Sequence, residues 1–110
     1  MTKRIEAFEY NGITFYFSYD FDIKTQTYIP HIIARRGLSI EDALYTYFNI
    51  TNQVFNINNN RWEAYSNVTN LGLYYNHYKC LQDNILIISL FFADNDLFKK
   101  LKINYKETDR

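Results

Sequence analysis

The sequence predicts a single α+β domain, an antiparallel sheet with helices packed on one of its faces. Three observations lead to this class. The chain has 110 residues, which is enough for one hydrophobic core. Aromatic residues make up 19% of it, with eleven Tyr and nine Phe, and these residue types favour half-buried strands. The strand and helix signals also separate along the chain into a hairpin, two short helices, an antiparallel meander and a C-terminal helix.

The N-terminal segment 4–19 predicts a β-hairpin. Asn11-Gly12 is typical of the type I′ turn in a two-residue hairpin, because both turn residues take positive φ angles. The apolar residues of the second strand share one face, which we expect to be the core side: Ile13, Phe15, Phe17 and Tyr19. The alternation then lapses, so residues 20–27 are expected to form a loop.

Two short helices are predicted next. Pro30 suits the start of a helix and Gly37 suits a helix end, so residues 31–36 form the first helix. Ser39, with Asp42 three residues later, is typical of a capping box and begins a second helix over 40–48. We expect its apolar residues to pack onto the sheet: Ile40, Leu44 and Tyr47 or Phe48.

The rest of the chain predicts a meander followed by a helix. Four strands are expected, separated by Asn-rich turns: 52–57, 61–69, 71–81 and 85–92. The last strand is apolar on both faces, which predicts a place in the middle of the sheet. A final helix over 97–102 and a frayed tail over 103–110 complete one domain spanning residues 1–110.

Composition narrows the function. Twelve Lys and Arg against twelve Asp and Glu give zero net charge, so any phosphate-binding site has to be local rather than part of a positive surface. Cys80 is the only cysteine, which excludes an intrachain disulfide and fits a reducing cytoplasm. No apolar stretch approaches the length of a membrane span, and the two His have no acidic residues at ligand spacing. We therefore expect no metal, no cofactor and no membrane partner.

The first helix carries a candidate site for RNA or phosphate. His31 and Arg35 lie four residues apart and can face the same way, and Arg36 adds a second guanidinium. The alternative is structural: the two arginines compensate the negative end of their helix, or they pair with Glu41 and Asp42.

The meander carries a second candidate site, which is catalytic. Its members are Arg61, Glu63, His77 and Lys79. They come together if the loop around Asn70 has an odd length, because Glu63 then lies opposite His77 and one sheet face holds an acid, a base and cations. A two-residue loop shifts the register by one and brings other residues to that face: Tyr74, Asn76, Tyr78 and Cys80. The alternative is a solvated face of mixed charge.

Three aromatic residues of the meander are candidate partner-binding residues: Trp62, Tyr65 and Tyr75. Trp and Tyr are enriched at interfaces because they bury a large apolar area and still carry a polar group. The alternative is that these rings fill the core.

A resemblance to a known family covers residues 35–44, which read Arg-Arg-Gly-Leu-Ser-Ile-Glu-Asp-Ala-Leu and are followed by Tyr47-Phe48. This segment resembles a pattern of BrnT-type toxins, in which basic residues, a Gly, an aliphatic residue and a Ser or Thr precede Glu, a second acidic residue and Ala. Residues 17–20 are similar to the opening of that family, and residues 85–90 resemble the closing strand of BrnT, RelE and MqsR-like toxins. The resemblance implies a small antiparallel sheet covered by helices and a metal-independent ribonuclease of a toxin–antitoxin pair.

Two hypotheses on function follow. The first is a metal-independent mRNA endonuclease that acts on RNA and is held by an antitoxin, and it depends on the resemblance and on the His77 face. The second is a non-enzymatic protein-interaction module, for instance a phage or mobile-element inhibitor of a host defence nuclease, which binds through aromatic residues and a sheet edge. A homodimer is compatible with both.

Overall fold

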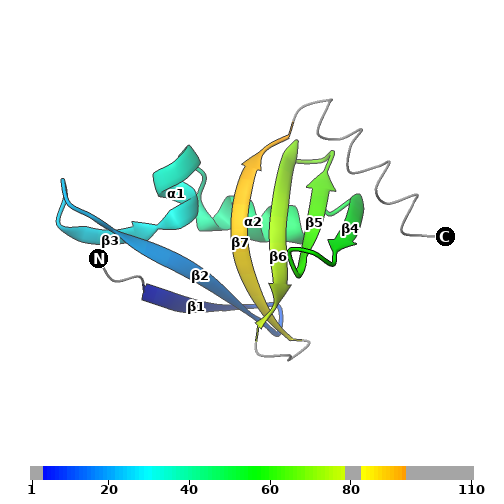
Figure 1. The fold of residues 1–110 in the computed structure, drawn as a ribbon, viewed down its shortest axis with the longest axis horizontal. Helices are drawn as coiled ribbons and strands as arrows, with labels where there is room; N and C mark the ends of the chain where they lie inside the picture. The colour runs from blue at the N-terminus through cyan, green and yellow to red at the C-terminus, as the bar shows by residue number, and fades with distance from the viewer. Residues whose placement is uncertain (1–3, 79–82, 94–110) are drawn as a thin grey trace.

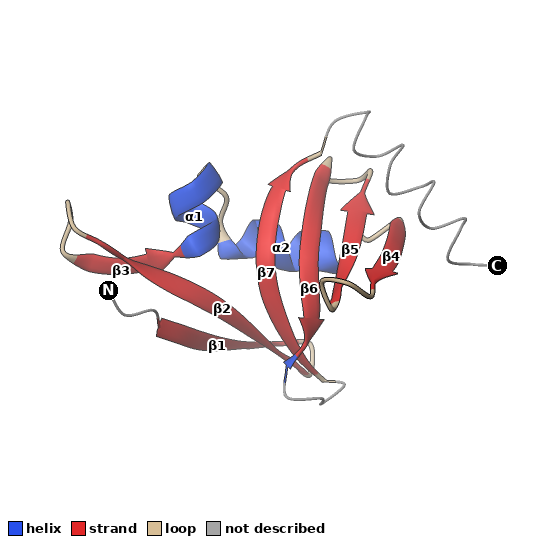
Figure 2. Cartoon of the chain, in the orientation of Figure 1, coloured by secondary structure: helices blue, strands red, loops and turns tan. Residues whose placement is uncertain are grey.

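The part of the protein that the structure describes contains one sheet of seven strands and two short helices (Figures 1 and 2). The computed structural model describes residues 4–78 and 83–93. Its elements in chain order are β1 (Arg4–Tyr10), β2 (Ile13–Asp22), β3 (Thr27–Pro30), α1 (His31–Arg36), α2 (Ile40–Tyr47), β4 (Asn52–Asn56), β5 (Arg61–Ser66), β6 (Leu71–His77) and β7 (Asn84–Phe92). The strand order is β1-β2-β7-β6-β5-β4, and β3 pairs with the end of β2.

The predicted fold class is wrong. The described chain is mostly strand rather than an α+β arrangement closed by a C-terminal helix, and its sheet is mixed, because β2 and β7 run parallel while the other neighbours run antiparallel. The expected helix over 97–102 and the tail over 103–110 lie outside the described residues.

The expected loop at 20–27 is also wrong, because a second hairpin replaces it. Strand β2 continues to Asp22 and turns back into β3, with Phe21 opposite Tyr28 and their rings 5.3 Å apart. The Asp22 carboxylate accepts hydrogen bonds from the Lys24 N–H and the Thr25 hydroxyl, which stabilises the turn. The polar residues that interrupt the alternation are therefore the turn of a hairpin.

The first hairpin is confirmed. Asn11 and Gly12 take φ angles of 52° and 78°, as a type I′ turn requires, and Tyr10 pairs with Ile13 across it. The expected core face of β2 is confirmed as well, since Phe15 and Phe17 are buried and pair with Ile85 and Ile87 of β7.

Both helices occur close to the predicted ranges. Helix α1 ends at Gly37, whose φ of 70° is left-handed, and α2 begins at a capping box in which the Ser39 hydroxyl accepts from the Asp42 N–H. Helix α2 lies behind the sheet in Figure 1. Ala43 is buried against the core, and the centroid of the Tyr47 ring lies 5.2 Å from that of Phe15. Neither of the two described helices is long and apolar enough to cross a membrane.

Tyr75, which is buried, and Tyr47, which is partly buried, predict a loss of stability at high pH. Burial raises the pKa of Tyr47 and, more strongly, of Tyr75, above the usual value of 10.0. Above about pH 10 the folded state holds protons that the unfolded state releases, so the free energy of unfolding should fall as pH rises from there and stay unaffected by these groups below it. Circular dichroism, which reports unfolding, and phenolate absorbance, which reports tyrosine ionisation, are followed from about pH 9 to about pH 12. Part of the tyrosines should ionise only as the circular dichroism signal of the fold is lost. Independent titration of all eleven tyrosines in a persistently folded protein would contradict this.

Candidate functional site

The structure does not assemble the predicted catalytic set on the meander. Four residues, 67–70, separate β5 from β6, and the resulting register places Glu63 opposite Tyr74. His77 belongs to the other face of the sheet, pairs with Ile85 and is exposed. Lys79 lies outside the described residues. The hypothesis that Glu63 and His77 act as a pair is therefore wrong.

Arg61 and Glu63 form a structural network instead. The Arg61 guanidinium donates to Glu63 Oε2 at 2.9 and 3.1 Å, and the Asn56 amide donates to the same oxygen at 3.1 Å. Arg61 also lies over the Tyr74 ring, 3.8 Å from its centroid. Because the Glu63 side chain is only 11% exposed, three donors on one carboxylate oxygen compensate its removal from water.

Glu63→Ala tests this structural role. The substitution removes the acceptor for Arg61 and Asn56, and we expect the free energy of unfolding to fall by about 1–2 kcal/mol, since Arg61 keeps some contact with water. Glu6→Ala is the matched control, because Glu6 accepts from Arg4, also two residues before it on a strand, but at an exposed site. It should cost less than about 1 kcal/mol in the same urea titration. Equal losses in the two variants would contradict the network.

The predicted partner-binding aromatics belong largely to the interior. Tyr65 and Tyr75 are buried, and the Tyr75 hydroxyl donates to the Gln53 side chain at 2.9 Å. Trp62 is half-buried and stacks on Tyr75, its cross-strand neighbour, with ring centroids 6.3 Å apart. The prediction that these three residues bind a partner is corrected for Tyr65 and Tyr75, which have too little accessible surface for contact.

The predicted phosphate site contains a His–Asp pair. His31 Nδ1 lies 2.5 Å from Asp20 Oδ2, so the imidazole is tied to β2 at the start of α1. Arg36 is exposed on the last turn of α1, and among the described residues no ion pair links it to Glu41 or Asp42. Arg35 occupies the adjacent position of the helix. A carboxylate beside an imidazole orients the ring, which is useful for proton transfer. The negative charge of the same carboxylate makes the site less favourable for binding a phosphate.

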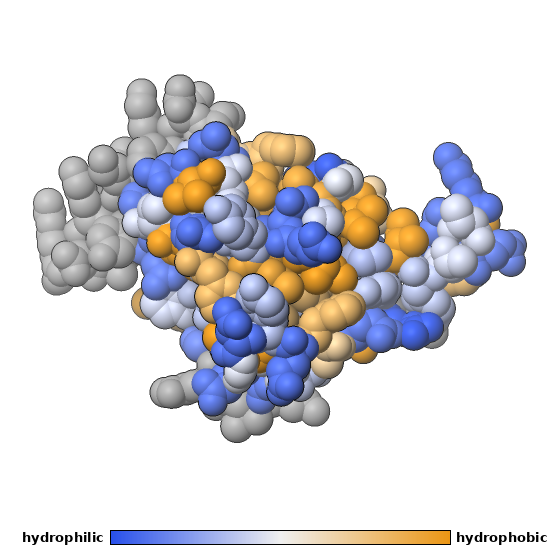
Figure 3. Space-filling model, turned by 180° about the vertical axis from the view of Figure 1, so that it is seen from behind, coloured by the Kyte–Doolittle hydropathy of each residue, from blue (hydrophilic) through white to orange (hydrophobic). Residues whose placement is uncertain are grey.

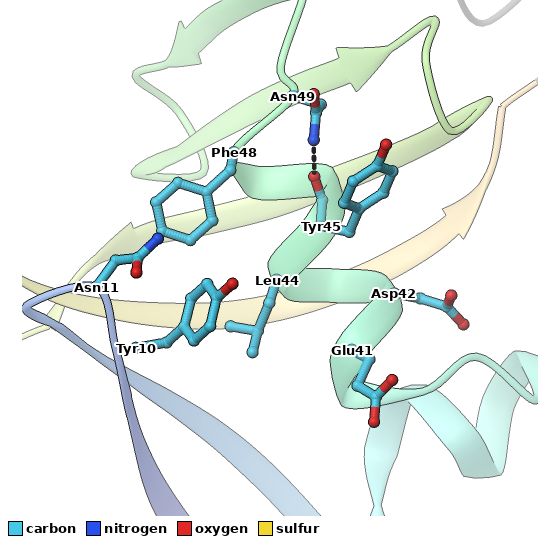
Figure 4. A pocket seen from close by; sticks show the side chains of 8 residues that line it. All are labelled: Tyr10, Asn11, Glu41, Asp42, Leu44, Tyr45, Phe48 and Asn49. Carbon is cyan, nitrogen blue, oxygen red and sulfur yellow. Dashed lines mark hydrogen bonds between the residues drawn. The ribbon is translucent and has the colours of Figure 1, made fainter.

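A surface hollow lies elsewhere, between α2 and the tip of the first hairpin. It has a volume of about 750 Å³ and is lined by Tyr10, Asn11, Glu41, Asp42, Leu44, Tyr45, Phe48 and Asn49 (Figure 4). We call it the α2 groove. Its helical members Glu41, Leu44, Tyr45 and Phe48 follow the spacing i, i+3, i+4 and i+7, so they form one stripe along α2.

The α2 groove exposes aromatic rings that are held from beneath. Tyr10, Tyr45 and Phe48 are 49%, 58% and 41% exposed. The Tyr10 and Phe48 rings meet edge to face with centroids 5.6 Å apart, and Phe48 also contacts the buried ring of Phe15 at 5.9 Å. Figure 3, which views the helix side, shows apolar side chains exposed between hydrophilic patches. Tyr10 and Phe48 therefore offer a partner apolar contact area whose side-chain conformations are already restricted, so that binding costs less conformational entropy.

Acidic groups border the same groove. None of its lining residues is basic, while Glu41 and Asp42 contribute two carboxylates from the first turn of α2. Asp42 Oδ2 accepts from the Ser39 N–H at 2.9 Å, whereas Glu41 is exposed and has no polar partner among the described residues. One carboxylate thus serves the helix cap and the other is available to a ligand.

Sequence reasoning missed this groove for a specific reason. Large apolar side chains lie both on the stripe of α2 that faces the sheet and on the stripe that faces outward. The sequence pattern predicts only that Leu44 and Tyr47 or Phe48 pack onto the sheet. The sequence signal for this groove is a short helix with large apolar residues on both sides, because only one side of an eight-residue helix can pack on the sheet. The second wall, Tyr10 and Asn11, comes from a hairpin about thirty residues earlier and could not be placed by local patterns.

The fold and the groove define a small, predominantly β protein with a supported aromatic surface on its helix side. Comparisons with protein-family models, with curated proteins and with solved structures find no match for this chain. Among the described residues, no group of three or more His, Cys, Asp or Glu side chains is arranged to hold a metal ion.

Proposed function

We propose that this protein is a non-enzymatic protein-interaction module of the cytoplasm, whose partner docks in the α2 groove. The observation that carries the proposal is the set of exposed aromatic rings, Tyr10, Tyr45 and Phe48. Phe48 rests on the buried ring of Phe15, and Tyr10 packs against Phe48. Aromatic side chains dominate the binding energy of protein interfaces, and exposed apolar patches of this kind mark interaction sites. An inhibitor that blocks a nuclease by occupying its surface is one protein of this class.

Site-specific photocrosslinking tests the proposal. The photoreactive residue p-benzoylphenylalanine is introduced at Tyr45, in the groove, or at Ile57, which is 82% exposed in the turn after β4 and outside the groove. Expressed in bacterial cells, the Tyr45 variant should yield a discrete crosslinked protein that the Ile57 variant does not.

The captured protein, once purified, should bind the unlabelled chain, and Phe48→Ala should weaken that binding by about tenfold or more. Tyr45→Ala serves as the second variant, because its ring is more exposed and its loss disturbs the fold less. Binding that neither substitution weakens would place the contact elsewhere and overturn the proposal.

A ribonuclease is the second candidate, and the His31–Asp20 pair is the observation that favours it. Together with the resemblance of residues 35–44 to BrnT-type toxins, this pair offers a proton-transfer group on the helix that also carries Arg36. The interaction proposal expects no cleavage of labelled single-stranded RNA by the folded protein, with or without EDTA.

The only two histidines of the chain supply a matched pair of variants. EDTA-resistant cleavage that is lost in His31→Ala and kept in His77→Ala would establish the ribonuclease at α1 and overturn the non-enzymatic proposal. Cleavage that is lost only in His77→Ala would place the catalytic site on the meander strands instead of at α1, and it would also overturn the non-enzymatic proposal.

A further inference from the structure

The α2 groove has two chemically different ends. Tyr10 and Phe48 form an aromatic end beside the hairpin turn, and Glu41 lies at the opposite end of the groove, toward the start of α2 (Figure 4). Seven residues of helix separate Glu41 from Phe48, which corresponds to about 10 Å at a rise of about 1.5 Å per residue. A ligand that fills the groove therefore meets an apolar surface and a carboxylate within one short segment.

The charge at the Glu41 end of the groove indicates which side chains a bound partner segment carries. The two carboxylates contribute two negative charges, while the positive end of the α2 dipole is equivalent to about half a charge, so this end of the groove stays negative. No basic residue lines the groove, and Glu41 has no partner among the described residues. An acidic segment or a phosphate backbone would be repelled here, whereas a cation gains a partner.

We propose that the partner segment carries a lysine or arginine close to a bulky apolar side chain. The apolar side chain packs on Tyr10 and Phe48, and the cation pairs with Glu41. The span of about 10 Å matches about three residues of extended chain at about 3.3 Å per residue, so the two side chains lie within about four residues of each other. Tyr45, 58% exposed on the same stripe, offers a ring face to the cation. This inference rests on the proposed function, since it names the chemistry of the partner at that site.

Selection of phage-displayed random peptides on the immobilised protein tests it. The expected result is enrichment of peptides in which Lys or Arg lies within about four residues of Leu, Met, Phe, Tyr or Trp. Binding of a synthesised selected peptide should weaken about three- to fivefold in Glu41→Gln at low salt, the range of an exposed ion pair. Glu9→Gln is the control, because Glu9 is also an exposed carboxylate near the hairpin tip but is not part of the groove; it should leave the affinity unchanged.

The outcomes separate this inference from the proposed function. Peptides that lose binding in Phe48→Ala and in Tyr45→Ala, yet show no enrichment of basic residues and no effect of Glu41→Gln, overturn the inference and leave the groove as a docking site. Peptides whose binding survives both aromatic substitutions, or a selection that yields no groove-dependent peptide, overturn both. Circular dichroism of each variant confirms that the fold is intact.

Discussion

Phe15→Ala is expected to lower the free energy of unfolding by about 3–5 kcal/mol, the largest effect of any substitution considered for this chain. The Phe15 side chain is fully buried, at 0% exposure, and its ring contacts both Tyr47 and Phe48. Truncation removes a ring from the contact between the sheet and α2, and the neighbouring rings cannot fill the space without leaving their own contacts. Urea titration of both proteins measures the difference.

Phe8→Ala is the matched control for this substitution. Phe8 is the direct cross-strand neighbour of Phe15 and lies on the same face, but it is 37% exposed because β1 is the end of the strand order. It should cost roughly half as much or less, since part of its ring already contacts water. Equal losses at the two positions would show that the hairpin packs as tightly as the centre of the sheet.

Phe15 also links the core to the α2 groove. The ring of Phe48 lies against Phe15, so Phe15→Ala removes a contact that holds Phe48 in place and changes the aromatic end of the groove. Partner binding should therefore weaken in Phe15→Ala even at temperatures where the variant is folded. The same reasoning explains why an exposed ring can hold a defined position, which a binding surface needs.

Local chemistry made several elements predictable from the sequence. The Asn11-Gly12 turn and the capping box at Ser39 are determined by a few adjacent residues, and both occur as expected. Gly37 ends α1 for the same kind of reason, because a left-handed residue follows the last turn.

Long-range pairing accounts for most of what could not be predicted. The parallel contact between β2 and β7 joins segments about seventy residues apart, and no local pattern specifies which strand fills that place. The β5–β6 register depends on a four-residue loop, and one residue more or less would have moved Glu63 from Tyr74 to another neighbour. The observed register separates Glu63 from His77, so the predicted catalytic set does not form, whereas Arg61 and Glu63 form an ion pair with a structural role.

The candidate binding site shows the same division. The aromatic composition is compatible both with a core and with a partner-binding face, and the structure buries Tyr65 and Tyr75 while Tyr45 and Phe48 are exposed. Which ring of an aromatic-rich chain reaches the surface depends on the element packed against it, and that element is α2. The sequence thus predicts the type of residue at the site better than its position.

Gly72→Ala is expected to cost about 2–3 kcal/mol, although replacing a glycine in a strand ordinarily stabilises it by about 0.5–1 kcal/mol. Gly72 is buried on β6, directly opposite Phe91 of β7. A Cβ atom added there would lie 2.1 Å from Cε2 and 2.5 Å from Cζ of the Phe91 ring. The ring contacts Tyr74 on the same face, with centroids 4.6 Å apart, so it cannot move aside without losing that contact.

A double-mutant cycle separates this steric cost from other effects. Phe91→Leu removes the ring atoms closest to the new methyl group, so Gly72→Ala should cost at least about 0.5 kcal/mol less in the Phe91→Leu background than in the parent. Gly12→Ala is the control: nothing lies within 4 Å of its added Cβ, and its cost comes from the φ angle of +78°, so Phe91→Leu should leave that cost unchanged. A neutral Gly72→Ala would mean that the Phe91 ring does not lie over the glycine, and the pairing of β6 with β7 at this point would have to differ from the one described.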